Sequence, residues 1–259
     1  MANNSNMSKR AALHRQQEMD ERNKKARRIT IGSIVVLAIV AVVVIAVVAV
    51  QALTNPKGVT ADQQTPAAGT DGYGVLIQGK QPSDDLPHLV IWEDYLCPYC
   101  GLAEQTYGQT VKQLVADGKM TAEIRTTFFL DGQRTNGPSR KAAMAAAAAA
   151  GVGKFDEYHA ALYADQAAEA VGFPESELRD RFARAAGIEG DDLKKFQELY
   201  DTGAFTDWIE AANDRFFADQ ISGTPTYLVG DEKLPITSGT IPTDADGFLA
   251  AVEELAAQQ

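Results

Sequence analysis

The chain has 259 residues, of which 45% are hydrophobic and 23% are charged, and its formal net charge is −11. These proportions are typical of a globular protein and exclude a wholly disordered or fibrous chain. The acidic balance argues against a nucleic-acid-binding protein, because neutralising phosphates requires a concentrated basic face. The two cysteines are too few for a disulfide-stapled scaffold or, within one chain, a four-cysteine zinc site.

The N-terminal segment combines a basic tail with a long apolar run. Residues 1–28 hold eight Lys/Arg against three Asp/Glu, so the remaining residues carry a net charge of −16. Residues 29–56 contain no charge, and residues 34–50 are apolar without interruption. About 20 apolar residues of helix cross a bilayer. We therefore expect a transmembrane signal anchor over residues 29–53 rather than a buried core helix or a cleavable signal peptide, whose apolar region is shorter.

The charges on either side of this span predict its orientation. Basic residues crowd the N-terminal side, whereas Lys57 stands alone just beyond the span. The positive-inside rule keeps residues 1–28 as a cytoplasmic tail of a single-pass protein of the cell membrane and places the following domain outside the cytoplasm. Residues 54–74, rich in Thr, Pro, Gly, Ala and Gln, are expected to form a flexible linker. Residues 75–259 have the size of one domain.

The first predicted elements form a strand–helix–strand unit. Residues 88–92 are short and apolar, a helical stretch continues to about residue 116, and residues 121–130 have strand composition. This order favours a parallel pair of strands joined by a right-handed crossover.

The rest of the domain reads as mostly helical. Pro138 opens a helix that contains the alanine-rich run 142–150, and Gly151 is its expected end. Further elements are expected at 155–166, 175–186, 191–200 and 204–219 (helices), 226–229 and 234–237 (strands) and 243–257 (helix). The predicted fold is an α/β sheet with an all-helical insertion over about residues 137–219.

The two cysteines lie in one motif, Cys97-Pro98-Tyr99-Cys100, between the first strand and its helix. The thiolate is the reactive form of cysteine, and the N-terminus of a helix stabilises it. We expect Cys97 to be an exposed nucleophile and Cys100, one turn into the helix, to be the resolving thiol. The alternatives are half a zinc site with His88 or His159, an inert structural disulfide, or a pair of buried free thiols. The strand before the motif and the helix after it favour the redox pair.

Three segments carry a family resemblance. EDYLCPYC (residues 93–100) resembles the active-site junction of DsbA-like thioredoxin-fold disulfide oxidoreductases, and ISGTPTYLV (residues 221–229) resembles their cis-proline loop. FDEYHAAL (residues 155–162) is similar to a helical-insertion motif of the membrane-anchored bacterial members. The resemblance covers about residues 75–258. It implies a thioredoxin fold with an all-helical insertion. We expect no cofactor or metal, because three histidines and two cysteines offer few ligands.

The resemblance also assigns roles to the second motif. It implies that Pro225 is cis and lies beside the active-site sulfurs, where its loop can pair with an extended substrate backbone. Thr224 would hydrogen-bond a sulfur or a bound peptide. An ordinary loop proline before a strand is the alternative.

Two acidic residues precede the cysteine motif. A carboxylate near Cys100 could accept its proton, and Asp94 fits the family pattern better than Glu93. Because side chains alternate along a strand, at least one of the two is expected to be solvated. His159 is expected to be a core residue.

The predicted function is that of an extracytoplasmic protein thiol-disulfide oxidoreductase. Its expected partners are reduced or unfolded secreted proteins, into which it introduces disulfides, and a quinone-linked membrane protein that reoxidises it. Tyr99 stands where the best-known oxidising relatives have histidine, so we expect the helix terminus to be the main cause of Cys97 acidity. A thiol reductase or isomerase and a Cu(I)-binding chaperone remain the alternatives.

Overall fold

The computed structural model describes residues 63–166 and 172–258. The expected cytoplasmic tail, the anchor over residues 29–53 and the first part of the linker lie outside the described residues. The chain separates into the units Met1–Lys57 and Gly58–Gln259, and the features below all belong to the second unit. Among the helices of residues 63–166 and 172–258, none combines the length and the apolar composition of a membrane span.

A mixed five-stranded sheet forms the centre of the domain. Its strands are β1 (Val75–Leu76), β2 (His88–Glu93), β3 (Thr121–Thr126), β4 (Thr226–Val229) and β5 (Glu232–Leu234), in the order β1-β3-β2-β4-β5. β2 and β3 are parallel, which confirms the predicted strand–helix–strand unit, and the other pairs are antiparallel. β1 was not predicted, because two residues are too few to show an alternating pattern.

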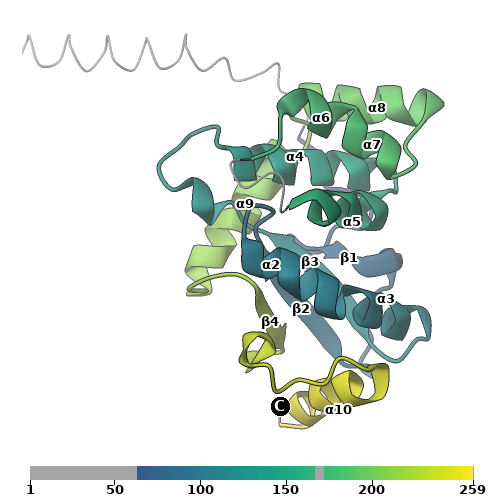
Figure 1. Cartoon of the computed structure of the whole chain (residues 1–259), viewed down its shortest axis with the longest axis vertical. Helices are drawn as coiled ribbons and strands as arrows, with labels where there is room; N and C mark the ends of the chain where they lie inside the picture. Colours follow the sequence, from purple (N-terminus) through teal and green to yellow (C-terminus); the bar gives the residue numbers. More distant parts are fainter. Residues whose placement is uncertain (1–62, 167–171, 259) are drawn as a thin grey trace, which may run out of the picture. The chain divides into compact units, whose positions relative to one another are not determined.

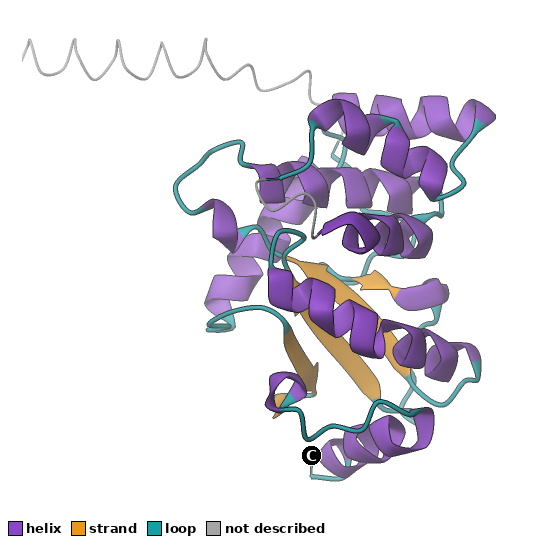
Figure 2. Cartoon of the chain, viewed as in Figure 1, coloured by secondary structure: helices purple, strands orange, loops and turns teal. Residues whose placement is uncertain are grey.

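Helices cover the sheet and form the insertion between β3 and β4. The crossover from β2 to β3 consists of α2 (Pro98–Ala103), the π-helical η2 (Glu104–Gly108) and α3 (Gln109–Ala116). The insertion contains α4 (Pro138–Gly151), α5 (Phe155–Asp165), α6 (Glu175–Arg179), α7 (Arg181–Ala185), α8 (Gly190–Asp201) and α9 (Thr206–Ala218). The remaining elements are η1 (Ile77–Gly79), η3 (Phe129–Asp131), η5 (Ile236–Ser238) and α10 (Ala245–Ala256). In Figure 1, helices α4 to α8 gather at one end of the sheet and α10 lies at the other, and Figure 2 shows the strands between them.

Three predicted elements differ from the structure. The strand expected at 121–130 ends at Thr126, and the chain then forms the 3-10 turn η3. The strand expected at 234–237 is replaced by β5 and η5, because Pro235 lies between them and has no N–H for a sheet. The helix expected at 175–186 is broken at Asp180, whose backbone leaves the helical region.

The described part of the expected linker packs on the domain. The backbone N–H of Gln64 donates to the carbonyl of Ala204 at 2.9 Å, and that of Leu76 donates to the carbonyl of Ala68 at 2.9 Å. Residues 63–74 therefore do not form a free tether as the composition suggested. Their backbone polar groups have partners within the fold, and composition alone does not indicate such pairing.

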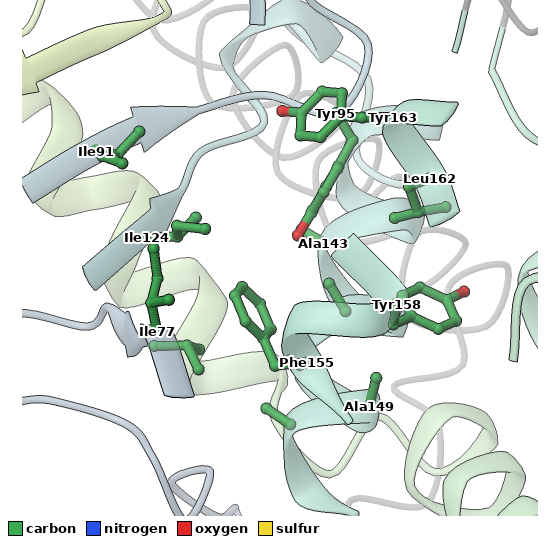
Figure 3. Packing of buried hydrophobic residues seen from close by; sticks show 14 of the residues in the cluster. Ile77, Ile91, Tyr95, Ile124, Ala143, Ala149, Phe155, Tyr158, Leu162 and Tyr163 are labelled. Atoms are coloured by element: carbon green, nitrogen blue, oxygen red, sulfur yellow. The ribbon is translucent and has the colours of Figure 1, made fainter. Parts of the chain in front are cut away.

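The core joins the sheet to the helical insertion. Ile91 and Ile124 of the sheet belong to the same buried cluster as Phe155 and Tyr158 of α5, and the cluster includes alanines of α4, two of which are labelled in Figure 3. Ala145–Ala150 are all at most 2% exposed, so α4 runs through the middle of the insertion. Alanine is the best helix former and has no side-chain entropy to lose, so this run can be helical and closely packed at once.

Candidate active site

The cysteine motif begins where β2 gives way to α2. Cys97 is the N-cap of α2, with extended backbone angles, and Pro98 occupies the first helical position. Proline is favoured there because its missing N–H would have no partner in the helix anyway. The Cys97 carbonyl accepts hydrogen bonds from the N–H groups of Cys100 at 3.0 Å and Gly101 at 3.3 Å. Cys100 therefore lies one turn into the helix, and both thiols are free.

The expectation that Cys97 is exposed is wrong. Its residue exposure is 5%, and Cys100 is 0% exposed. The Cys97 side chain turns inward and its thiol donates to the Thr224 carbonyl at 3.2 Å, so the loop before β4 covers the sulfur. The adjacent Tyr99 is 68% exposed. Cys97 thus lies just below the protein surface, whereas Cys100 is fully buried.

The loop that covers Cys97 contains the second predicted motif. The Thr224–Pro225 peptide bond is cis. Thr224 and Cys97 are 127 positions apart in the sequence, and the pairing of β2 with β4 brings them together. The structure therefore places Cys97, Cys100, Thr224 and Pro225 in one site.

The Cys97 thiol is acidified within this site. Its pKa is lowered to about 6, first by a hydrogen bond from the Cys100 thiol, against the opposing effect of burial. Smaller contributions come from Thr224 and from the backbone N–H groups of Cys100 and Tyr99. The sequence had suggested that the helix terminus is the main cause of the lowered Cys97 pKa. That expectation is wrong, because the Cys100 thiol contributes more.

Thr224 acts on Cys97 through two groups with opposite effects. Its carbonyl accepts a hydrogen bond from the neutral Cys97 thiol and so favours the protonated form. Its buried hydroxyl has no hydrogen-bond partner in the structure. That hydroxyl can donate to a thiolate, and the Thr224 side chain lowers the pKa of Cys97. On ionisation the sulfur can exchange the carbonyl contact for the hydroxyl.

Cys100 has the opposite behaviour. Burial raises its pKa far above the ordinary thiol value, and its hydrogen bond to Cys97 and the charge of Glu93 raise it further. The pair thus contains one acidic sulfur and one that stays protonated and donates to it. This division of roles is what a nucleophilic and a resolving cysteine require.

Both acidic residues before the motif are buried, so the expectation that one is solvated is wrong. Glu93 is 1% exposed and Asp94 is 0% exposed, because helices of the insertion cover the end of β2. Glu93 Oε2 lies 2.7 Å from His159 Nε2 of α5. Burial alone would lower the pKa of His159, but the carboxylates of Glu93 and Glu104 raise it overall. His159 is a core residue, as expected, and it is also the partner of a buried carboxylate.

Asp94 serves a different purpose from Glu93. Its carboxylate accepts hydrogen bonds from the Ser139 hydroxyl at 2.7 Å and from the N–H groups of Leu96 at 2.9 Å and Leu130 at 3.2 Å. Burial raises the pKa of Asp94 to about 6. These contacts fasten the active-site loop to α4 and η3. The charge of Glu93 raises the pKa of Cys100, whereas the role of Asp94 as proton acceptor stays a prediction.

One group of side chains has the composition of a metal site. Ligand atoms of Glu93, Glu104 and His159 lie within 4.8 Å of one another. The Lys112 ammonium lies 2.7 Å from Glu104, so a cation already compensates that carboxylate, and His159 compensates Glu93. His88 bonds to Thr121 at the start of β3. Neither histidine completes a zinc site with the thiols.

The sequence analysis did not single out Gln166, which also touches the site. Its side-chain amide donates to the carbonyls of Tyr95 at 2.7 Å and Cys97 at 2.8 Å. A glutamine at the end of a predicted helix carries no signal of its own, and only its contacts with the Tyr95 and Cys97 carbonyls reveal its role.

Two thiols at the start of the helix that follows a central strand, covered by a cis-proline loop, define a thioredoxin-fold protein with a dithiol site. A family model described as thioredoxin matches residues 77–254, and the chain belongs to that family.

Solved structures support the same fold. The chain is similar to the thiol-disulfide oxidoreductase MdbA of Actinomyces oris, with a TM-score of 0.60, 18% identity and coverage of 76% of this chain and 95% of that one. It is also similar to MdbA of Corynebacterium diphtheriae, with a TM-score of 0.58, 19% identity and coverage of 75% and 95%. Oxidised DsbA of Mycobacterium tuberculosis matches with a TM-score of 0.50, 22% identity and coverage of 76% and 91%. Among curated proteins, none matches the chain. The resemblance to DsbA-like thioredoxin-fold proteins is confirmed for family and fold.

Proposed function

We propose that the protein is a membrane-anchored, extracytoplasmic thiol-disulfide oxidoreductase that introduces disulfides into secreted proteins. The observation that carries this proposal is the contrast between the two sulfurs, since Cys97 has a pKa of about 6 and touches a Cys100 whose pKa is raised. Family membership and the oxidoreductase fold of the similar structures support it.

The reaction starts from the disulfide form. A substrate thiolate attacks Cys97 Sγ, the Cys97–Cys100 bond breaks, and Cys100 leaves as a thiolate that takes up a proton. A second substrate thiolate then attacks the substrate sulfur of the mixed disulfide, and Cys97 leaves as a thiolate. The substrate has lost two electrons and gained a disulfide, and the enzyme holds the reduced pair. The proposed quinone-linked membrane partner accepts those electrons and restores the disulfide.

The acidity of Cys97 favours this direction. A thiolate with a low pKa is a good leaving group, and stabilising it stabilises the reduced enzyme, which makes the disulfide form more oxidising. Tyr99 supplies no positive charge to this thiolate. Hydrogen bonds from the Cys100 thiol and the Thr224 hydroxyl stabilise the thiolate instead.

Glu93 is the proposed proton exchange partner of Cys100. The charge of Glu93 raises the pKa of the Cys100 thiol, and the Glu93 Oε1 atom is buried without a hydrogen-bond partner. In its protonated form the Glu93 carboxyl group can give a proton to the departing Cys100 thiolate, and the carboxylate that results can take the proton back on reoxidation. His159 supplies a positive charge to the other oxygen.

The surface around the site suits reduced, unfolded chains. Among the described residues, the exposed large hydrophobic side chains are Tyr99, Leu102, Leu130 and Phe217, and the first two lie on α2 beside the cysteines. Such side chains can bind apolar segments that a folded protein would hide. The Thr224–Pro225 loop would pair with the extended substrate backbone.

The test is disulfide formation in a reduced, unfolded model protein such as ribonuclease A. The protein in its disulfide form should introduce disulfides into reduced ribonuclease A, and Cys97→Ala should abolish this reaction. Tyr99→Phe is the matched control, because it alters the motif without altering a sulfur. Full activity of Cys97→Ala would refute the proposal. Tight Cu(I) binding by the reduced protein without disulfide transfer would favour the chaperone function instead.

A further inference from the structure

Gln166, directly after α5, reaches across the first turn of α2. The residue is 8% exposed. Its single Nε2 group donates both hydrogens, one to the Tyr95 carbonyl at 2.7 Å and one to the Cys97 carbonyl at 2.8 Å. A buried amide with two carbonyl acceptors two residues apart forms a bridge over the turn where the strand becomes the active-site helix.

A glycine makes this bridge possible. A Cβ atom built on Gly101 would overlap the Oε1 atom of Gln166. Gly101 is itself buried within α2, where alanine would otherwise be the better helix former by about 1 kcal/mol. Helix α2 therefore has a glycine, a poor helix former, at the position where the Gln166 amide crosses it.

The bridge fixes the backbone that carries the reactive sulfur. The Cys97 carbonyl already accepts the N–H groups of Cys100 and Gly101, and Gln166 is its third donor. Anchoring the carbonyls at both ends of the Tyr95–Cys97 segment restricts the torsions between them. Those torsions aim Cys97 Sγ at the Cys100 thiol, at the Thr224 side chain and at the N–H groups of the first helical turn, which are the groups that lower the pKa of Cys97.

We propose that Gln166 is a positioning residue that keeps Cys97 in the geometry required for a stabilised thiolate, and that Gly101 provides the space for it. The helical insertion would thereby set the acidity of the nucleophile and the redox equilibrium of the pair. This inference rests on the proposed function for its importance in turnover, but the thiolate equilibrium can be measured without any substrate.

The experiment titrates the reduced protein by the absorbance of the thiolate near 240 nm and equilibrates it with glutathione. Gln166→Ala should lower the ionisation constant of Cys97 about five-fold, the effect of one ordinary hydrogen bond. Because a less stable thiolate makes the reduced form less stable, the equilibrium with glutathione at neutral pH should shift by up to about five-fold toward the disulfide form of the protein. Gly101→Ala should have the same effect, because the flexible end of Gln166 moves away while the chain stays folded.

Two comparisons separate positioning from a general loss of stability. Gln197→Ala is the matched control, because the Gln197 amide of α8 also donates to a carbonyl, that of Arg179 in α6 at 3.4 Å, and these two helices carry none of the site residues described above. It should leave both equilibria unchanged. In the double variant Gly101→Ala/Gln166→Ala, the second substitution should add nothing to the first.

The outcomes are distinguishable from those of the proposed function. Unchanged equilibria in Gln166→Ala, shifts of equal size in Gln197→Ala, or additive effects in the double variant would each overturn the inference. If Gln166→Ala does not fold, the Cys97 ionisation and the glutathione equilibrium of Gly101→Ala test the inference, and unchanged values in that variant would overturn it. Shifted equilibria in a protein that oxidises no substrate would support the role of Gln166 and refute the proposed function.

Discussion

Replacing His159 by leucine should destabilise the domain strongly, because it leaves the Glu93 carboxylate buried without a positive partner. The two side chains are 0% and 1% exposed, and their Nε2 and Oε2 atoms are 2.7 Å apart. Removing one member of a buried ion pair costs about 3–5 kcal/mol in the free energy of unfolding. A domain in the upper part of the ordinary stability range, about 5–15 kcal/mol, stays folded after that loss.

The cost of this substitution should depend on pH. The folded-state pKa of His159 is raised above the unfolded value of about 6.5. The pair therefore contributes its full stability below the unfolded pKa and loses it as the pH rises through the folded pKa. Urea unfolding followed by circular dichroism should show the largest difference between wild type and His159→Leu near pH 6, and a smaller difference in alkaline solution.

Two variants complete this test. Adding Glu93→Gln to His159→Leu should recover part of the stability, because no unpaired charge is then buried. Lys154→Ala, which breaks an exposed pair with Glu157, should leave the free energy of unfolding nearly unchanged, because solvent screens such a pair. A cost below about 1 kcal/mol for His159→Leu, or a cost that does not vary with pH, would refute the reasoning.

Two further predictions concern single side chains. Thr224→Val removes the hydroxyl but keeps the carbonyl and the shape, so the pKa of Cys97 should rise in a thiolate absorbance titration, and an unchanged value would show that the hydroxyl has no effect. Asp94 has a folded-state pKa of about 6 against an ordinary value of 3.8, so it stabilises the fold at low pH and loses that contribution as the pH rises through about 6. Urea unfolding should therefore show a loss of about 2–3 kcal/mol from this group between about pH 4 and pH 7, and Asp94→Asn should be free of it. An equal slope in both proteins would contradict this prediction.

The sequence predicted what depends on local pattern. The Cys97–Cys100 motif between a strand and a helix, the parallel pair of strands and the alanine-rich helix all follow from residues close together in the chain. The family resemblance supplied the long-range partner of the motif, Pro225, which spacing alone could not.

What the sequence could not predict depends on packing between distant segments. Alternation along β2 suggested that Glu93 or Asp94 is solvated, but the insertion buries both faces of the strand end. The exposure of Cys97 was overestimated because the Thr224 loop folds over it. Gln166 carries no motif, and its contact with Cys97 exists only because α5 ends beside α2. The described linker residues similarly gain partners that their composition does not show.

Trapping the mixed disulfide tests the division of roles between the two sulfurs most directly. Cys100→Ala in its Cys97–glutathione disulfide form should be attacked by an unfolded protein that has a single reduced cysteine, and glutathione leaves as a thiolate. Because neither Cys100 nor a second substrate thiol is present to break the new bond, the covalent complex should accumulate. Peptide mass spectrometry should then find the substrate linked to Cys97. In the reciprocal variant, Cys97→Ala, no complex should form, since Cys100 is buried and protonated. A complex through Cys100, or none in either variant, would contradict the account.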